Sequence, residues 1–556
     1  MIKCIVNKSL GTLVGPFPIS FIGIVSNLSG KKSWIGSSKL VFEAIPVNIK
    51  RLKDCGLEID FDDQTGELEA LKEFESLPHQ YSNVDDLQTE CRPRIKLRDY
   101  QKKALALSSD RNSYAYFLEM GLGKSAIAIS NIGTLVKAGK LTGALILSPK
   151  GVHRQWLDEQ FPEHMDESIN WKGLLWKGLK LDIKKGSEEV TILSMNIDAI
   201  RTKHGNQLAK DFLMMHSPKS MIVIDESHLI KTASAQRTKM AWELGRLAQY
   251  RRIMTGTPIS KNVADLWSQF KFLDERILGH RYFVSFRSQY CIMGGFENRQ
   301  IVGQKNTEEL YSQISPHCFR LTKSEAIDLP EKIYVKRRYE MNEECNRHYQ
   351  QLKKTFMTQL SDGSIVDVPN AVSCLVRLQQ VLSGYLPTED ESFEVFSDDR
   401  VNQLLEIVRQ TSGPMVVWAR FTQDILRIVE ALNKEEGKNA AVAYYGGNVN
   451  DRDDSVKLFL SNQARFFVSN PAAGGTGLNL QGSGCQTVVY YNNDFNYITR
   501  MQSEDRTHRL GTKGAVTYFD LVADKSVDRA ILKNLGAKKS LSRLTLDEIR
   551  QTLSDE

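Results

Sequence analysis

The chain has 556 residues, of which 41% are hydrophobic and 25% charged, and its formal net charge is +6. This composition is typical of a folded globular protein and excludes a disordered chain, and the length is sufficient for several domains. The modest basic excess suits a polyanionic partner without requiring one. The eight cysteines are scattered, with no pair at the spacing of a zinc site. We therefore expect a reducing compartment and no structural zinc.

The amino-terminal 90 residues differ from the rest and predict a small α+β module. An apolar run over residues 10–25 follows two lysines, as in a signal sequence, but Pro16 and Pro18 would break a helix there. We therefore predict β-structure for this run. We expect a chain that is cytoplasmic, or nuclear in a eukaryote, and neither secreted nor attached to a membrane.

A short basic and aromatic stretch of this module gives it a possible role. Lys31, Lys32 and Trp34 could pair with or stack on exposed nucleotides, which would make residues 1–90 a DNA-binding module. The alternative is an ordinary small domain with Trp34 in its core. The sequence leaves both interpretations open.

From residue 95 onward, short apolar strands alternate with amphipathic helices, which predicts an α/β fold with parallel sheets. The candidate strands form two groups, at residues 144–147, 191–193, 221–224 and 252–254, and then at residues 415–418, 466–468 and 488–491. We therefore predict one lobe over residues 91–275 and a second over residues 399–556. Between them, the charged helical pattern of residues 276–398 predicts helical insertions and a linker.

A glycine-rich turn occurs in the sequence FLEMGLGKSAIAI, between an apolar strand and an apolar helix. Gly121 and Gly123 allow the backbone to approach a phosphate, and the helix N-terminus adds N–H donors and a positive dipole. Lys124 would then contact the β- and γ-phosphates of ATP, and Ser125 would hold Mg²⁺. Leu118 stands where the common phosphate-loop pattern has its first glycine. A plain turn ahead of a helix is the alternative.

Two acidic residues follow an apolar strand in the sequence MIVIDESHLI. Hydrolysis of a γ-phosphate requires both neutralised charge and an aligned water molecule. We predict that Asp225 supports Mg²⁺ and that Glu226 polarises the attacking water. The alternative is a solvated strand end, which the presence of Lys124 disfavours.

Five motifs occur in one order along the chain, namely GLGKS, DESH, MTGTP, GGTGLNL and QSEDRTHRLG. In this order they resemble the motifs of superfamily two helicases. The longer segments DESHLIKTASAQRTK and DRTHRLGTKGAVTYFDL resemble the corresponding motifs of the Swi/Snf-like branch, and not those of the DEAD-box RNA helicases. Over residues 95–530, this resemblance implies two RecA-like lobes and an ATPase that uses ATP and Mg²⁺. The compact build would suit a bacterial or phage member, and residues 30–60 resemble the small module that precedes the motor in annealing-helicase relatives.

The resemblance also implies roles at the nucleotide site. Gln101 matches the glutamine that reads adenine, with Arg98 and Tyr100 beside it, although Asp99 stands where the family usually has proline. The residues expected to bind ATP are Arg98, Gln101, Met120, Gly121, Leu122, Gly123, Lys124, Ser125 and Gly475. Catalytic roles fall to Lys124, Asp225, Glu226, Arg506 and Arg509.

Arg506 and Arg509 match arginines that reach the γ-phosphate from the second lobe, where a guanidinium stabilises the transferring phosphoryl group. A surface basic patch is the alternative. Thr255, Gly256 and Gln502 are expected to couple ATP to DNA, although the TGTP turn could simply end a strand.

The resemblance places DNA contacts in short polar turns, which hold phosphates without reading bases. The residues are Lys150, Arg154, Trp156, Asn196, Arg420, Gly474, Thr476 and Asn479. We therefore expect a monomeric, DNA-dependent translocase that acts on duplex or forked DNA in repair, replication-fork or recombination processing, or that displaces bound proteins. A motor subunit of a restriction or defence complex, with a nuclease or methylase in trans, is the alternative. An RNA helicase is less favoured.

Overall fold

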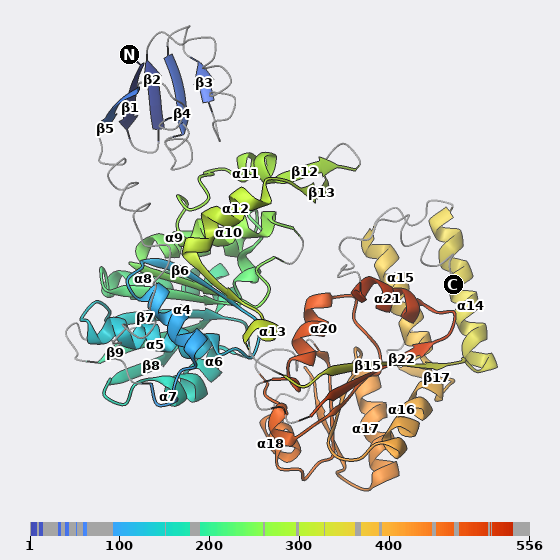
Figure 1. Cartoon of the computed structure of the whole chain (residues 1–556). Helices are drawn as coiled ribbons and strands as arrows, with labels where there is room; N and C mark the ends of the chain where they lie inside the picture. Colours follow the sequence, from blue (N-terminus) through green and yellow to red (C-terminus); the bar gives the residue numbers. More distant parts are fainter. Residues whose placement is uncertain are drawn as a thin grey trace. The chain divides into compact units, whose positions relative to one another are not determined.

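The computed structural model forms two compact units, Met1–Ala326 and Ile327–Glu556 (Figure 1). Among the residues described, no helix is long and apolar enough to cross a membrane. The structure describes residues 2–7, 10–14, 32–34, 39–43, 52 and 59–63, and residues 93–536 except 151, 178–188, 260–261, 296–299, 327–328, 362–367, 389–391, 447–451, 472–477, 510–511 and 513.

The described amino-terminal residues form a five-stranded sheet in the order β3-β4-β2-β1-β5. Its strands are β1 (Ile2–Asn7), β2 (Leu10–Val14), β3 (Lys32–Trp34), β4 (Lys39–Glu43) and β5 (Ile59–Asp63). Strand β2 confirms β-structure for the first part of the apolar run, whereas residues 15–25 and Lys31 lie outside the described residues. Trp34 pairs with Leu40 in the sheet register. The role of this module in DNA binding stays a prediction.

The first α/β lobe is built on a seven-stranded sheet with the order β14-β6-β11-β10-β7-β9-β8. Every neighbouring pair is parallel. The strands are β6 (Ser113–Leu118), β7 (Gly143–Ser148), β8 (Trp171–Leu175), β9 (Val190–Asn196), β10 (Ser220–Asp225), β11 (Tyr250–Met254) and β14 (Cys318–Leu321). The central strands are almost continuously apolar because helices cover both faces of a parallel sheet.

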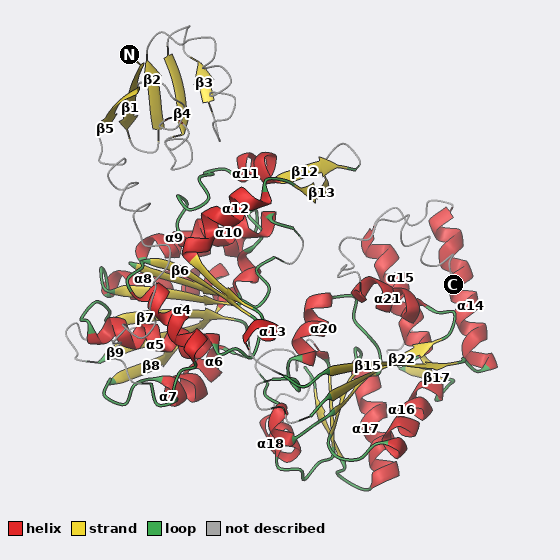
Figure 2. Cartoon of the chain, viewed as in Figure 1, coloured by secondary structure: helices red, strands yellow, loops and turns green. Residues whose placement is uncertain are grey.

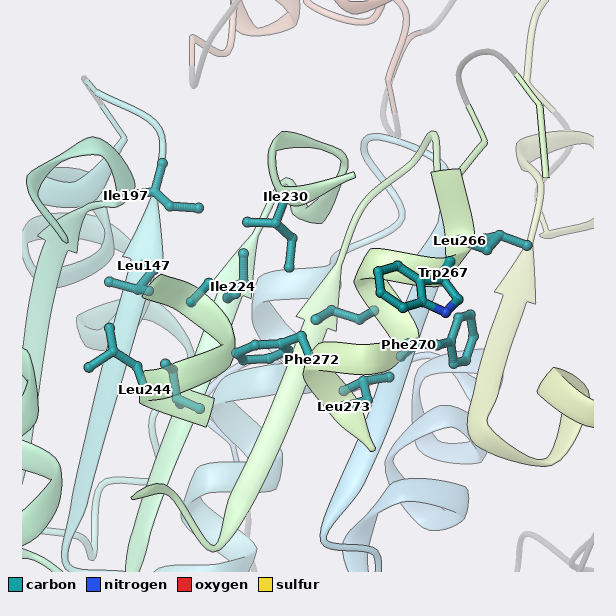
Figure 3. Packing of buried hydrophobic residues seen from close by; sticks show 14 of the residues in the cluster. Leu147, Ile197, Ile224, Ile230, Leu244, Leu266, Trp267, Phe270, Phe272 and Leu273 are labelled. Carbon is teal, nitrogen blue, oxygen red and sulfur yellow. The ribbon is translucent and has the colours of Figure 1, made fainter. Parts of the chain in front are cut away.

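The first α/β lobe contains several helices in addition to this sheet. They are α4 (Asp99–Ser109), α5 (Lys124–Lys137), α6 (His153–Gln155), α7 (Phe161–His164), α8 (Lys203–Met215), α9 (Gln236–Leu247) and α10 (Ala264–Leu273), followed by α11 (Phe283–Tyr290), α12 (Thr307–Ile314) and α13 (Lys323–Ala326). Short helical turns η1 (Trp156–Gln160), η2 (Ile197–Arg201) and η3 (Ser227–Ile230) follow α6, β9 and β10. Figure 3 shows the buried core between the strands and helices α9 and α10, where Leu147, Ile224 and Phe272 are fully or almost fully buried.

The second lobe has a six-stranded parallel sheet in the order β15-β22-β21-β18-β20-β19. Figure 2 shows β15 and β22 of this sheet as yellow arrows. Its strands are β15 (Lys332–Tyr339), β18 (Met415–Trp418), β19 (Ala441–Tyr444), β20 (Phe466–Ser469), β21 (Thr487–Tyr490) and β22 (Val516–Ala523). Its helices are α14 (Glu343–Ser361), α15 (Val368–Leu382), α16 (Asp399–Gln410), α17 (Thr422–Glu436), α18 (Arg452–Leu460), α20 (Tyr497–Glu504) and α21 (Val527–Gly536). The predicted α/β fold with two parallel-sheet lobes is confirmed.

Residues 276–398 contain more strand than their helical pattern predicts. Strand β14 extends the first sheet beside β6, and β15 pairs with β22 in the second sheet. Two hairpins are also present, formed by β12 (Cys291–Gly294) with β13 (Gln300–Gln304) and by β16 (Tyr385–Pro387) with β17 (Phe393–Val395). The interpretation of this segment as helical insertions and linker is corrected, because it divides between the two units and supplies an edge strand to each sheet.

Candidate nucleotide site and nucleic-acid track

Three turns of the first lobe meet at one edge of its sheet. Strand β11 lies between β6 and β10, and all three are parallel, so their carboxyl ends point the same way. The glycine-rich loop follows β6, the acidic pair lies at the end of β10, and the TGTP turn follows β11. Ligand sites of parallel α/β sheets form at this edge.

The loop after β6 has the backbone of a phosphate cradle. Gly121 and Gly123 have φ values of 85° and 75°, which suit glycine, and α5 begins at the next residue, Lys124. Leu118 is the last residue of β6 and is fully buried, so the position of the missing first glycine belongs to the strand. Nζ of Lys124 donates to the carbonyl oxygens of Leu118 at 2.9 Å and Glu119 at 3.4 Å. The ammonium group therefore lies against the backbone at the start of the loop.

Gln101, expected to read adenine, lies directly against this loop. Its Nε2 donates to the carbonyl oxygen of Leu122 at 3.1 Å, and its Oε1 accepts from the backbone N–H of Arg98 at 2.8 Å. A β-carbon on Gly123 would lie 2.2 Å from the same Nε2. Asp99, which replaces the usual proline, is the first residue of α4 and pairs with Lys102 at 2.9 Å. Gln101, the residue expected to read adenine, is thus in direct contact with the phosphate loop.

The Gly123→Ala variant is expected to lose ATP binding by at least about tenfold, because the new methyl group would displace both Gln101 and the loop. Gly139→Ala is a matched control, since Gly139 also has a positive φ, 67°, but a β-carbon there would meet no atom within 4 Å. Titration with a fluorescent ATP analogue measures both affinities. Equal losses in the two variants would show that strain in the backbone, and not the close contact with Gln101, is responsible.

The pKa values of the two acidic residues at the end of β10 are shifted in opposite directions. Burial and the charge of Glu226 raise the pKa of Asp225, while Lys124 and an indole hydrogen bond from Trp156 oppose this change. Burial also acts to raise the pKa of Glu226, but hydrogen bonding and electrostatic interaction with His228, together with Lys124, outweigh it and lower the pKa. Glu226 is therefore ionised at neutral pH, as a group that polarises water must be.

The TGTP turn contacts both other turns of the site. Oγ1 of Thr255 donates to Oε2 of Glu226 at 3.1 Å and lies 3.2 Å from Nδ1 of His228, which is itself 3.1 Å from Oε2 of Glu226. A β-carbon on Gly256 would lie 3.2 Å from the backbone nitrogen of Met120, so this turn packs closely on the phosphate loop. The expected coupling residues of the first lobe, Thr255 and Gly256, are thus in direct contact with the nucleotide site.

Two residues of this network are absent from the sequence-based prediction. His228 completes the triangle with Glu226 and Thr255. Gln269, fully buried on α10, accepts from Oγ of Ser227 at 2.7 Å and donates to the carbonyl oxygen of Pro258 at 2.7 Å. The DESH motif itself could have indicated His228, whereas Gln269 has no local signal because its role depends on the packing of α10.

The expected site residues of the second lobe are described within that lobe alone. Arg506 is buried, and its Nη1 donates to the carbonyl oxygen of Leu478 at 3.1 Å. Arg509 is partly exposed, with a pKa lowered by burial and partly offset by Asp505, and Gln502 lies partly exposed on α20. Gly474, Gly475 and Thr476 lie outside the described residues.

The expected nucleic-acid contacts divide into exposed and internal residues. Lys150, Arg154 and Asn479 are exposed, as a phosphate contact requires. Asn196 is partly exposed, and its Oδ1 accepts from the backbone N–H of Asp198 at 3.0 Å at the start of η2. Exposure is compatible with a role in the nucleic-acid track for these four residues.

Two of the side chains expected to contact DNA form hydrogen bonds with other residues of the protein instead. Trp156 is only 1% exposed and its indole contacts Asp225, so the prediction that it touches DNA is corrected. The guanidinium of Arg420 donates to Oε1 of Gln379 within the second lobe, and burial lowers its pKa. The polar sequence around Trp156 suggests a surface turn, but the apolar face of that turn packs inward.

The donor set of the first lobe fits a magnesium ion. Mg²⁺ prefers oxygen ligands, usually one or two protein groups completed by water and substrate phosphates. Ser125 is the second residue of α5, and Asp225 ends β10, where the indole N–H of Trp156 holds one of its carboxylate oxygens. These two residues would hold the ion, which would neutralise charge on the phosphates.

Comparison with known proteins agrees with this architecture. The chain matches the model of the SNF2-related domain over residues 100–384 and that of the helicase conserved C-terminal domain over residues 399–511. It is 24% identical to an uncharacterized ATP-dependent helicase of Mycoplasma genitalium over 81% of this chain and 42% of that protein. It is also 24% identical to a putative ATP-dependent helicase/translocase of Bacillus subtilis, over 85% of this chain and 51% of that protein.

The chain spans about half the length, or less, of these curated relatives. Among solved structures, the SWI2/SNF2 ATPase core of Sulfolobus solfataricus in complex with dsDNA is 22% identical, with 83% of this chain and 97% of that chain covered and a TM-score of 0.39. The SNF2-related model alone covers more than half of the sequence. The chain therefore belongs to the SNF2-related family.

Proposed function

We propose that the chain is an ATP-dependent DNA translocase that hydrolyses ATP as it moves along duplex or forked DNA. One observation carries the proposal, namely the direct contact of the TGTP turn with both the acidic pair and the phosphate loop. The hydrogen bond between Thr255 and Glu226 gives a direct route by which a change in the nucleotide would reach the turn. The family assignment supports a helicase-type motor.

The proposed chemistry uses residues of this chain in separate roles. Lys124 binds the β- and γ-phosphates. Ionised Glu226 orients the attacking water and accepts a proton from it. Ser125 and Asp225 hold Mg²⁺, which supplies charge neutralisation when bound. Arg509 of the second lobe stabilises the transferring phosphoryl group when ATP brings the lobes together, which links hydrolysis to domain motion.

The proposed DNA contacts are electrostatic and carry little sequence information. Lys150 and Arg154 are exposed on the segment after β7. The last residue of β7, Ser148, pairs with Asn196 at the end of β9, so the segment begins beside Asn196. Such side chains bind phosphate oxygens and fix the position of a strand without reading its bases. Stimulation by DNA should therefore fall steeply as the salt concentration rises.

The test is ATP hydrolysis by the purified chain alone and with single-stranded DNA, duplex DNA, forked DNA or RNA. Strong stimulation by duplex or forked DNA is the expected result, and a preference for forks would support a role in fork, repair or recombination processing. Stimulation by RNA alone would replace the proposal with an RNA helicase. Hydrolysis that appears only with an added nuclease or methylase partner would indicate a motor subunit of a defence complex.

A further inference from the structure

The segment that follows β7 carries both exposed basic side chains and a buried side chain that contacts the candidate nucleotide site. Lys150 and Arg154 are exposed, whereas Trp156, two residues after Arg154, is buried. Nε1 of Trp156 donates a hydrogen bond to Oδ2 of Asp225 at 3.2 Å. The strand register explains this contact, because Leu147 near the end of β7 pairs with the residue that precedes Asp225 on β10.

The backbone around the indole is held on both sides. Trp156 begins η1, a π-helical segment, and its carbonyl oxygen accepts from the backbone N–H of Phe161. Insertions of this kind are rare and occur frequently at functional sites, where they change the direction of a side chain. Before it, the carbonyl oxygen of His153 accepts from Oγ of Ser194 on β9 at 2.5 Å. The indole is therefore fixed relative to α6, which carries Arg154.

We propose that Trp156 is a positioning residue that links nucleic-acid binding at Arg154 to the orientation of the Asp225 carboxylate. The indole N–H holds one carboxylate oxygen and leaves the other to face a metal ion, as outer-shell partners of metal ligands do. A phosphate bound at Arg154 would shift α6, and the indole would transmit this shift to Asp225. The nucleic-acid half of this inference rests on the proposed function, whereas the contact with Asp225 does not.

The first experiment uses Trp156→Phe, which keeps an aromatic ring and removes the N–H donor. The Mg²⁺ concentration needed for half-maximal binding of a fluorescent ATP analogue is expected to rise about tenfold or more, the usual cost of losing an outer-shell partner. Duplex DNA should then stimulate hydrolysis much less than in the wild-type chain. Trp171→Phe is the matched control, because Trp171 packs on Phe161 with ring centroids 5.2 Å apart in the same aromatic cluster. It should leave both quantities unchanged.

An unchanged Mg²⁺ requirement in a folded Trp156→Phe variant would overturn the proposal and leave the indole as core packing alone. If the wild-type chain shows no stimulation by nucleic acid, the proposed function fails, but the Mg²⁺ titration still decides the link to Asp225. The two failures are thus distinguishable.

A second measurement uses the wild-type sequence, so that it does not depend on the folding of a variant. The seven tryptophans are labelled with 5-fluorotryptophan and observed by fluorine NMR in the presence of an ATP analogue. Paramagnetic Mn²⁺ in place of Mg²⁺ should broaden most strongly the resonance of Trp156, the indole bonded to Asp225. Duplex DNA is expected to shift that same resonance. A resonance broadened by Mn²⁺ that does not respond to DNA would contradict the proposed link.

Discussion

The Lys124→Ala variant is expected to lose ATP hydrolysis by at least about 100-fold, a typical effect of removing a group that stabilises transition-state charge. Nζ of Lys124 lies 2.9 Å from the carbonyl oxygen of Leu118, the last residue of β6 before the phosphate loop. Its charge also favours the ionised forms of both carboxylates, although burial and the charge of Glu226 still leave the pKa of Asp225 raised. Without it, the phosphates lose their cation and the two carboxylates lose the charge that favours their ionised forms.

Lys140→Ala is the matched control for this variant, because Lys140 lies just beyond the other end of α5 and is exposed. Steady-state hydrolysis of ATP measures the effect, and a thermal unfolding curve checks that both variants are folded. Hydrolysis at the wild-type rate in Lys124→Ala would show that the loop after β6 is not the nucleotide site.

Much of this site could be predicted from sequence because its parts lie in consecutive residues. A phosphate loop needs glycines next to a helix start, and a carboxylate pair after a buried strand needs only a change from apolar to acidic residues. Gly123, Lys124 and Asp225 therefore appear in the sequence in the form that the structure shows. The central strands are equally clear, since strands buried on both faces are continuously apolar.

The remaining features depend on contacts between distant residues. Strands β14 and β15 lie at sheet edges, and the alternating polar residues of β15 resemble a charged helical segment more than a buried strand. Trp156 lies in a polar stretch that favours a surface role, and only the packing of η1 shows that it turns inward to Asp225. Gln269 joins two motifs from α10, which no spacing along the chain reveals.

The Glu226→Gln variant is expected to bind ATP and DNA together while its hydrolysis falls by at least about 100-fold, as expected when a positioned general base is lost. Glutamine has the same shape and retains a carbonyl oxygen that can accept from Oγ1 of Thr255, so the contact with the TGTP turn can persist. It lacks the negative charge that polarises water. Glu226 also adopts a left-handed backbone conformation, φ 55°, which the surrounding contacts hold in place.

Binding and chemistry are separated by comparing Glu226→Gln with Lys124→Ala. The first should keep ATP bound, and the second should weaken binding as well as hydrolysis, because of these two residues it is Lys124 that we propose to bind the phosphates of ATP. Fluorescence anisotropy of labelled duplex DNA, with and without ATP, should show a long-lived complex in Glu226→Gln alone. Glu243→Gln, a change in an exposed pair with Lys210, should behave as the wild-type chain does. Rapid hydrolysis by Glu226→Gln would require another residue to activate the water, and the contact between Glu226 and Thr255 would then be structural only.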